Sequence, residues 1–129
     1  MKKLTILLLA AILLTACGKT NGKEQEAMYV HITAQEAKTI MDTEEGYVIL
    51  DVREQDEYDA GHIPGAILIP YTQIEEKAEE VLTDKDQLIL VYCRSGRRSK
   101  IAAEALVELG YTNIKEFGGI IDWPYEVTE

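Results

Sequence analysis

The chain is poor in basic side chains, in cysteine and in histidine. Its 129 residues hold 13 Lys and Arg against 23 Asp and Glu, a formal net charge of −10 at pH 7. A nucleic-acid partner requires a basic footprint, so this balance argues against one. It argues equally against electrostatic adhesion to anionic lipid. The two cysteines and two histidines lack ligand spacing, so we predict no metal site and no cofactor.

The chain also lacks an apolar run long enough to cross a bilayer. Residues 4–14, LTILLLAAILL, are 11 in number, whereas a spanning helix needs roughly 20. They follow Lys2 and Lys3 and have the length of the apolar region of a signal peptide. The run ends in Leu-Thr-Ala-Cys at residues 14–17, which resembles a bacterial lipobox. The alternative is an ordinary secretory signal with an incidental cysteine.

The resemblance to lipoproteins implies that residues 1–16 are a signal peptide removed before Cys17, which becomes the lipidated first residue. Lipid on Cys17 would anchor the protein to the bacterial cell membrane, with its domain on the extracytoplasmic side. Loss of residues 1–16 moves the net charge from −10 to −12 and leaves Cys93 as the one free thiol. Residues 17–27 then form the lipidated N-terminus and a flexible tether, and residues 28–129 form one domain.

Within residues 28–129, strand patterns alternate with helix patterns. Strands are expected at residues 29–32, 47–50, 66–69, 88–92 and 114–117, and helices at 33–41, 72–81 and 99–109. Gly110 is expected to cap the last helix, and the pair Gly118 and Gly119 to break the last strand. This alternation predicts an α/β fold with a central, mostly parallel sheet and helices on both faces.

Two of the expected helices have distinct faces. In residues 72–81 charged side chains dominate, and we interpret the acidic run at 75–80 as a solvated face. In residues 99–109 one apolar face is predicted to be buried; it comprises Ile101, Ala102, Ala105, Leu106 and Leu109.

A lone thiol surrounded by positive charge follows the most apolar strand, in VYCRSGRRS at residues 91–99. A thiol reacts as the thiolate, which is favoured by a helix N-terminus, by nearby cations and by hydrogen bonds to sulfur. The next helix, the arginines and a glycine-containing loop can supply all three. Because ligands bind at the carboxyl ends of parallel strands, Cys93 and Asp51 are expected on the same rim. The pattern predicts an anionic substrate with an atom electrophilic toward sulfur.

These residues resemble the active-site loop of the rhodaneses, the single-domain sulfurtransferases. Two further stretches agree: ILDVREQDEYDAGHIPGAILIP at residues 49–70, and GYTNIKEFGGIIDWPYE at residues 110–126. The first resembles the family's Asp-Val-Arg strand end and Gly-His-Ile-Pro-Gly-Ala turn, and the second its Gly-Gly-(three residues)-Trp segment. The three blocks occur in family order, and the resemblance covers residues 28–129.

The resemblance implies a rhodanese-like fold and a ping-pong transfer of sulfur. Cys93 would attack the sulfane sulfur of an anionic donor such as thiosulfate, and a thiol or cyanide would then take that sulfur from the persulfide. The persulfide would lie in a cradle of loop amides. The cradle comprises Arg94, Ser95, Gly96, Arg97, Arg98 and Ser99, with Arg94 and Arg97 as the first candidates to guide the donor.

Two other functions remain open. The fold resembles that of dual-specificity phosphatases, but those use Cys-x5-Arg, whereas Cys93 and Arg98 form Cys-x4-Arg, a tighter loop suited to a single sulfur atom. A non-catalytic persulfide carrier or binding module is the second alternative.

Other residues have a structural interpretation. Asp51 and Arg53 are expected to support the rim, and His62 to fix a turn. His31 is expected to be a half-exposed strand residue. Phe117 and Trp123 are expected to pack in the core or at the rim.

Overall fold

A computed structural model describes residues 28–129; the predicted signal peptide, Cys17 and tether lie outside the described residues. Five parallel strands form one sheet in the order β1-β5-β4-β2-β3. The strands are β1 (Val30–His31), β2 (Val48–Asp51), β3 (Ile67–Leu68), β4 (Ile89–Cys93) and β5 (Ile114–Gly119). All five expected strands are therefore present, although β1 and β3 are only two residues long.

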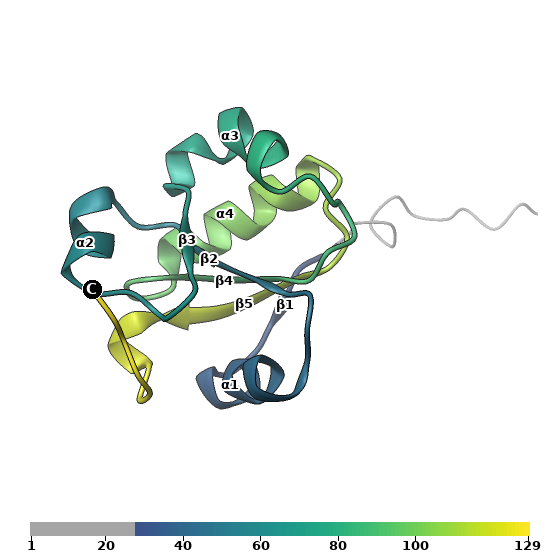
Figure 1. Cartoon of the computed structure of the whole chain (residues 1–129). Helices are drawn as coiled ribbons and strands as arrows, with labels where there is room; N and C mark the ends of the chain where they lie inside the picture. Colours follow the sequence, from purple (N-terminus) through teal and green to yellow (C-terminus); the bar gives the residue numbers. More distant parts are fainter. Residues whose placement is uncertain (1–27) are drawn as a thin grey trace, which may run out of the picture.

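Helices cover both faces of this sheet. They are α1 (Ala34–Thr43), α2 (Gln55–Ala60), α3 (Ile74–Val81) and α4 (Arg97–Glu108), with short 3₁₀ turns at Tyr71–Gln73 and Ile120–Asp122. Figure 1 shows α1 on one face, α3 and α4 on the other, and α2 beside the carboxyl ends of the strands. The predicted α/β fold is confirmed.

The core divides into two layers because successive strand residues point to opposite faces. Leu50 and Val91 pack on the α4 side with Leu106, whereas Ile49 and Leu90 pack on the α1 side. All five residues of β4 are buried, as expected for the centre of a parallel sheet. Each buried Leu or Ile contributes roughly 1.5–3 kcal/mol, so β4 is held firmly from both sides.

Helix α4 differs from its prediction in two respects. It begins at Arg97, two residues before the expected start at Ser99. The prediction that Ile101 is buried is wrong, since 39% of its surface is exposed, whereas Ala103 is fully buried. The helix is rotated so that small alanines, not the larger isoleucine, lie against the sheet. Gly110 adopts φ of +95° and ends the helix as predicted.

The two consecutive glycines do not break the last strand, so that prediction is wrong. They form the end of β5, where Gly119 pairs with Cys93 across a register shift. A Cβ atom on Gly119 would lie 1.9 Å from the carbonyl oxygen of Arg94. Gly119 therefore serves a close approach of the loop that follows Cys93.

Helix α2 was not predicted from the sequence. None of its six residues is buried, so it has no apolar periodicity to reveal it. Its start is set by local hydrogen bonding, in which the Glu54 N–H donates to the Glu57 carboxylate at 3.2 Å. The helix matters to the site because it carries Glu57.

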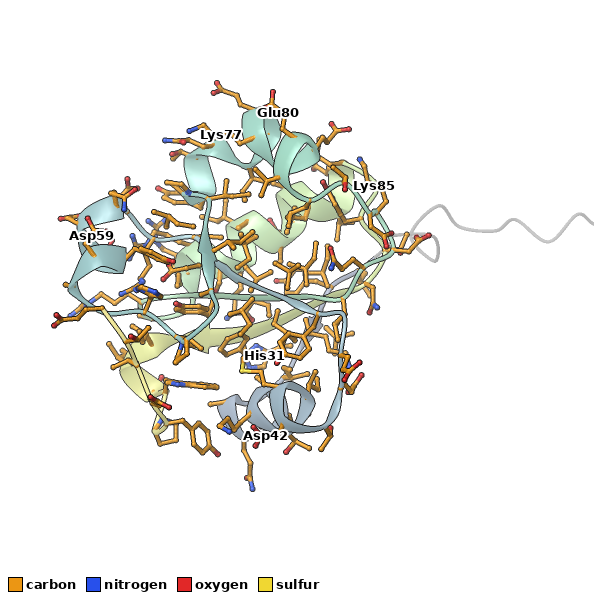
Figure 2. The ribbon with its side chains drawn as sticks, viewed as in Figure 1. His31, Asp42, Asp59, Lys77, Glu80 and Lys85 are labelled. Carbon is orange, nitrogen blue, oxygen red and sulfur yellow. The ribbon has the colours of Figure 1, made fainter. Side chains whose placement is uncertain are left out.

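The outer surface is charged. Figure 2 shows the labelled side chains of Asp42, Asp59, Lys77 and Glu80 projecting away from the sheet. The expected solvated face of α3 is confirmed, since its glutamates are exposed while Ile74 is buried. Among residues 28–129, no helix is both long and apolar enough to traverse a bilayer.

Candidate active site

Cys93 is the last residue of β4 and belongs to the core layer on the α4 side. The sequence placed it one residue beyond the strand. Only 1% of its surface is exposed, and its Sγ accepts a hydrogen bond from the Gly96 N–H at 3.0 Å. The sulfur thus lies beneath the loop that joins β4 to α4, at the carboxyl edge of the sheet where ligands of such folds bind.

The loop over Cys93 depends on glycine. Gly96 has φ of +108°, in the left-handed region, and is the N-cap of α4. This conformation turns its N–H back toward Sγ at the positive end of a 12-residue helix. Arg94, Ser95 and Arg97 lie on the exposed side of the loop. A backbone N–H and the positive end of a helix are thus both directed at Sγ.

The three arginines of the loop have different surroundings. Arg94 and Arg97 are exposed, and the Arg97 guanidinium lies 5.9 Å from the centre of the Tyr71 ring. Arg98 instead forms a bidentate ion pair with Glu57 of α2, at 2.6 and 2.9 Å.

The ion pair between Arg98 and Glu57 shifts the pKa of both residues. The hydrogen bond from Arg98 is the main reason that the pKa of Glu57 is lowered to about 2. The hydrogen bond to Glu57 likewise raises the pKa of Arg98. Arg98 is thus occupied by a carboxylate, which leaves Arg94 and Arg97 to meet an anion from solvent.

A second acid, Glu116, reaches the cysteine through a hydroxyl. Ser99 Oγ lies 3.4 Å from Cys93 Sγ and donates to Glu116 Oε1 at 2.6 Å. The Gly118 N–H also donates to Oε1, at 2.7 Å, and His31 Nδ1 lies 2.6 Å from Oε2. Sequence reasoning named neither Glu116 nor a site role for His31. The available signal was a charge at an inward position of the apolar strand, two residues after Ile114.

Asp51 and Arg53 lie at the neighbouring strand end. The Arg53 Nη2 and Nε atoms contact the Asp51 carboxylate at 2.7 and 3.0 Å, and Nη2 also donates to the Gly61 carbonyl at 2.7 Å. The Tyr92 hydroxyl donates to Asp51 at 2.7 Å. The pKa of the Tyr92 hydroxyl is raised mainly by its burial and then by this hydrogen bond to Asp51. The group joins β2, β4 and the turn after α2.

The histidine of that turn and the C-terminal aromatic residues are structural. The His62 ring stacks on Tyr58 with centroids 3.7 Å apart, and its backbone pairs with Thr128. Phe117 and Trp123 pack together with centroids 5.6 Å apart, which confirms the core interpretation.

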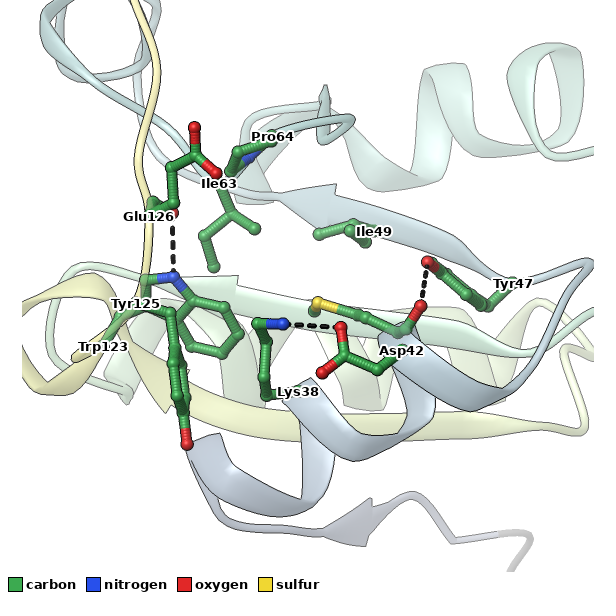
Figure 3. A pocket seen from close by; sticks show the side chains of 10 residues that line it. Lys38, Asp42, Tyr47, Ile49, Ile63, Pro64, Trp123, Tyr125 and Glu126 are labelled. Atoms are coloured by element: carbon green, nitrogen blue, oxygen red, sulfur yellow. Dashed lines mark hydrogen bonds and ion pairs between the residues drawn. The ribbon is translucent and has the colours of Figure 1, made fainter.

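A pocket of about 210 Å³ lies on the α1 side of the sheet, between α1 and the C-terminal segment (Figure 3). Ile49, Ile63 and Trp123 line it, and these residues belong to the core layer opposite that of Cys93. The pocket is therefore separate from the thiol.

The arrangement around Cys93 suits nucleophilic chemistry. A buried sulfur receives a backbone hydrogen bond at a helix N-terminus, and two free arginines lie on the exposed side of its loop. Backbone donors at a helix N-terminus and nearby arginines are features that reactive cysteines share. No group of three potential metal ligands occurs in the described part of the chain.

Comparison with known proteins gives the family. The model of the Rhodanese-like domain matches residues 33–124. The chain is 40% identical over 73 residues to the thiosulfate sulfurtransferase PspE of Escherichia coli (strain K12), covering 57% of this chain and 70% of the relative. It is 36% identical over 107 residues to the "Putative sulfur carrier protein YrkF" of Bacillus subtilis (strain 168), covering 82% of this chain. The match spans 57% of the length of that relative.

Solved structures agree. A structure described as rhodanese with anions from E. coli is 35% identical, has a TM-score of 0.61, and covers 64% of this chain and 98% of its own. The thiosulfate sulfurtransferase from Pseudomonas aeruginosa is 27% identical with a TM-score of 0.71, covering 78% of this chain and 20% of its own. With a family model that matches most of its length, this chain belongs to the rhodanese-like domain family.

Proposed function

We propose that the protein is a sulfurtransferase that carries sulfane sulfur on Cys93. The observation that supports this most directly is the 3.0 Å hydrogen bond from the Gly96 N–H to a buried Sγ at the start of α4. The relatives named thiosulfate sulfurtransferase add to it. The proposed donor is a small anion such as thiosulfate, and the proposed acceptor is a thiol or cyanide.

In the proposed reaction the Cys93 thiolate attacks the outer sulfur of thiosulfate. A new S–S bond forms, the original S–S bond breaks, and sulfite leaves with the electron pair. The terminal sulfur of the persulfide then carries the negative charge, which the Gly96 N–H and the helix N-terminus favour. An acceptor attacks the same terminal sulfur and releases the Cys93 thiolate.

We assign the guidance of the donor to Arg94 and Arg97 because both are exposed on the loop. Arg98 is held by both oxygens of Glu57 and serves to join the loop to α2. This pairing also disfavours a phosphatase, in which the corresponding arginine must be free to bind the phosphate oxygens.

The test of this function is mass spectrometry of the full chain after treatment with thiosulfate. The protein should gain one sulfur atom, lose it on addition of cyanide with release of thiocyanate, and show no gain as Cys93→Ser. Arg94→Ala and Arg97→Ala should each raise KM for thiosulfate about tenfold, since each removes a charge that attracts the donor. Absence of the sulfur adduct on the intact protein would refute the proposal.

A persulfide-carrier function is the second candidate, supported by the likeness to YrkF. A carrier would form the same adduct but would pass its sulfur slowly to small thiols and to cyanide. The rate of persulfide formation and the rate of sulfur transfer to a small acceptor distinguish the two functions. A transferase passes sulfur to small acceptors at least as fast as it takes sulfur from thiosulfate.

We further propose that the protein is anchored by lipid on Cys17 at the extracytoplasmic side of the bacterial membrane. The support is the signal-like segment that ends in Leu-Thr-Ala-Cys. A bacterium expressing the full chain should incorporate labelled palmitate into it, and Cys17→Ala should abolish the incorporation. Label retained by Cys17→Ala would refute this anchor.

A further inference from the structure

Glu116 is a fully buried acid whose partners carry no permanent charge. None of its surface is exposed, and it lies at an inward position of β5 facing α4. A buried carboxylate is costly unless it is neutralised or well hydrogen-bonded. Its partners are the Ser99 hydroxyl, the Gly118 N–H and the His31 imidazole, at 2.6, 2.7 and 2.6 Å. These partners therefore include no arginine or lysine that would offset the charge of a carboxylate.

Ser99 couples this acid to the reactive sulfur. Its Oγ lies 3.4 Å from Cys93 Sγ and 2.6 Å from Glu116 Oε1. The Ser99 hydroxyl has one hydrogen, so it can donate to the Glu116 carboxylate or to a Cys93 thiolate but not to both at once. With Glu116 ionised the hydrogen goes to Oε1, and the hydroxyl oxygen can accept from a Cys93 S–H.

A thiolate beside an ionised Glu116 would place two anions in one buried unit. Two acidic groups that share such a site resist being ionised together. The conflict vanishes if the thiol proton moves into the unit when the thiolate forms. The unit then holds one negative charge before and after the transfer.

We propose that Glu116, acting through Ser99, takes up the proton of the Cys93 thiol as the thiolate forms, and that the proton stays within the unit, where His31 can share it. The proposal rests on the sulfurtransferase function above and adds the path of the proton. The S–H bond breaks as Ser99 Oγ–H forms, and the original Oγ–H bond breaks as Glu116 Oε1–H forms. No electrons are exchanged, and the charge of the unit is unchanged. Ser99 touches the reacting sulfur, whereas Glu116 is a positioning residue.

His31 is placed to connect the unit to solvent. Its Nδ1 lies 2.6 Å from Glu116 Oε2, yet 60% of its side chain is exposed. An imidazole exchanges protons near neutral pH through both ring nitrogens. The ring can therefore share the proton of the buried carboxyl group, and the charge of the unit stays the same.

Other charged groups face the unit without entering it. Tyr29, which precedes β1, has a pKa raised by burial first and then by the charges of Glu104 and Glu116. Glu104 lies on the exposed side of α4. The positive charge of Arg98 lies near Cys93, but Glu57 holds this guanidinium. Glu104 thus offers a control, because it is a nearby negative charge outside the chain of contacts.

The test is the pH profile of Cys93 alkylation by iodoacetamide, a small uncharged reagent, in the full chain. With one proton shared inside the unit, the rate should change less than about twofold between pH 6 and pH 8. In Glu116→Gln the thiol can lose its proton only to solvent. Its rate should then rise about tenfold per pH unit and fall at least about tenfold below the unsubstituted chain at pH 6.

Three variants make the assignment specific. Glu104→Gln removes a nearby charge and should keep the flat profile. Ser99→Ala breaks the path at its other end and should give the sloping profile. The double variant with Glu116→Gln should be alkylated no more slowly than either single variant.

Three outcomes would overturn the proposal. A sloping profile in the unsubstituted chain would show that no proton is shared. If Glu116→Gln is alkylated faster than the unsubstituted chain at every pH, Glu116 acts only as a repelling charge. If its alkylation profile is unchanged, Glu116 is only structural. Failure to form a persulfide would instead count against the sulfurtransferase function, since alkylation reports on the proton path without any sulfur transfer.

Discussion

Two fully buried carboxylates flank β4, and their partners differ in kind. Asp51 ends β2 on one side, and Glu116 lies in β5 on the other. Asp51 is bound by the Arg53 guanidinium at 2.7 Å, a cation at every relevant pH. Glu116 is bound by a hydroxyl, an amide and an exposed imidazole. The first carboxylate has a permanent cation as its partner, whereas these contacts of the second include none.

The surroundings reflect this difference. Burial acts to lower the pKa of Arg53, but the hydrogen bond and charge of Asp51 outweigh burial, so the pKa is raised. Arg53 also holds the Gly61 carbonyl, so the pair joins β2 to the following turn. Glu116 instead contacts Ser99, which touches the reactive sulfur. Asp51 is thus connected to a turn of the fold, whereas Glu116 is connected to the site of the thiol.

The largest expected effect comes from neutralising the two acids in turn. Asp51→Asn leaves a buried Arg53 without a counter-charge and should lower the free energy of unfolding by about 3–5 kcal/mol. Glu116→Gln leaves no orphaned cation and should cost about 1 kcal/mol. Urea denaturation of the two isosteric variants measures the contrast. Equal losses would contradict the distinction drawn between these acids.

A second prediction concerns the glycine that joins β5 to the loop over Cys93. Gly119→Ala places a Cβ 1.9 Å from the Arg94 carbonyl oxygen, so the loop must move. We expect a loss of about 2–3 kcal/mol in unfolding free energy and at least a tenfold slower loading of Cys93 with sulfur. Thermal unfolding measures the loss of stability, and a single-turnover reaction with thiosulfate measures the rate of sulfur loading.

The matched control is Gly46→Ala, at a turn before β2. Gly46 has φ of +77° and nothing within 4 Å of a built Cβ, so only backbone strain of about 1 kcal/mol is expected. Sulfur loading should be unchanged. Normal loading in Gly119→Ala would mean that the loop tolerates the shift and that Gly119 is not needed for the site.

The smallest expected effect concerns Glu57, the acid held by Arg98. Its pKa is lowered from 4.5 to about 2, so its contribution to stability is complete above pH 4.5 and is lost as the pH falls toward about 2. A quarter of its side chain is exposed, and solvent screening limits the contribution to about 0.5–1 kcal/mol. Glu57→Gln should be less stable at pH 7 by that amount.

The check for Glu57 is the difference in unfolding free energy between the two chains, measured from pH 7 to pH 2. The difference should shrink toward zero across the window from pH 4.5 to about 2. A constant difference would assign the loss to packing and not to the ion pair.

Patterns that depend on local order were predictable. The capping residue Thr33 accepts a hydrogen bond from the Glu36 N–H at 3.0 Å, at the expected start of α1. The strand β4 lies within one residue of its expected position, and the glycine stop at Gly110 lies where expected. Helix α2 was missed because six residues without a buried side chain leave no periodic signal. Ile101 was misplaced because periodicity alone does not determine how a helix is rotated against its sheet.

The sequence by itself determined the alternation of strands and helices, the position of the Cys93 thiol at a strand end, and the glycine that lets its loop turn. Each of these follows from neighbours along the chain. Only the tertiary structure decided which charges meet: Arg98 with Glu57, and Ser99 with Glu116. These pairs are separated by 41 and 17 positions, and only the packing of α4 against α2 and against β5 brings them together.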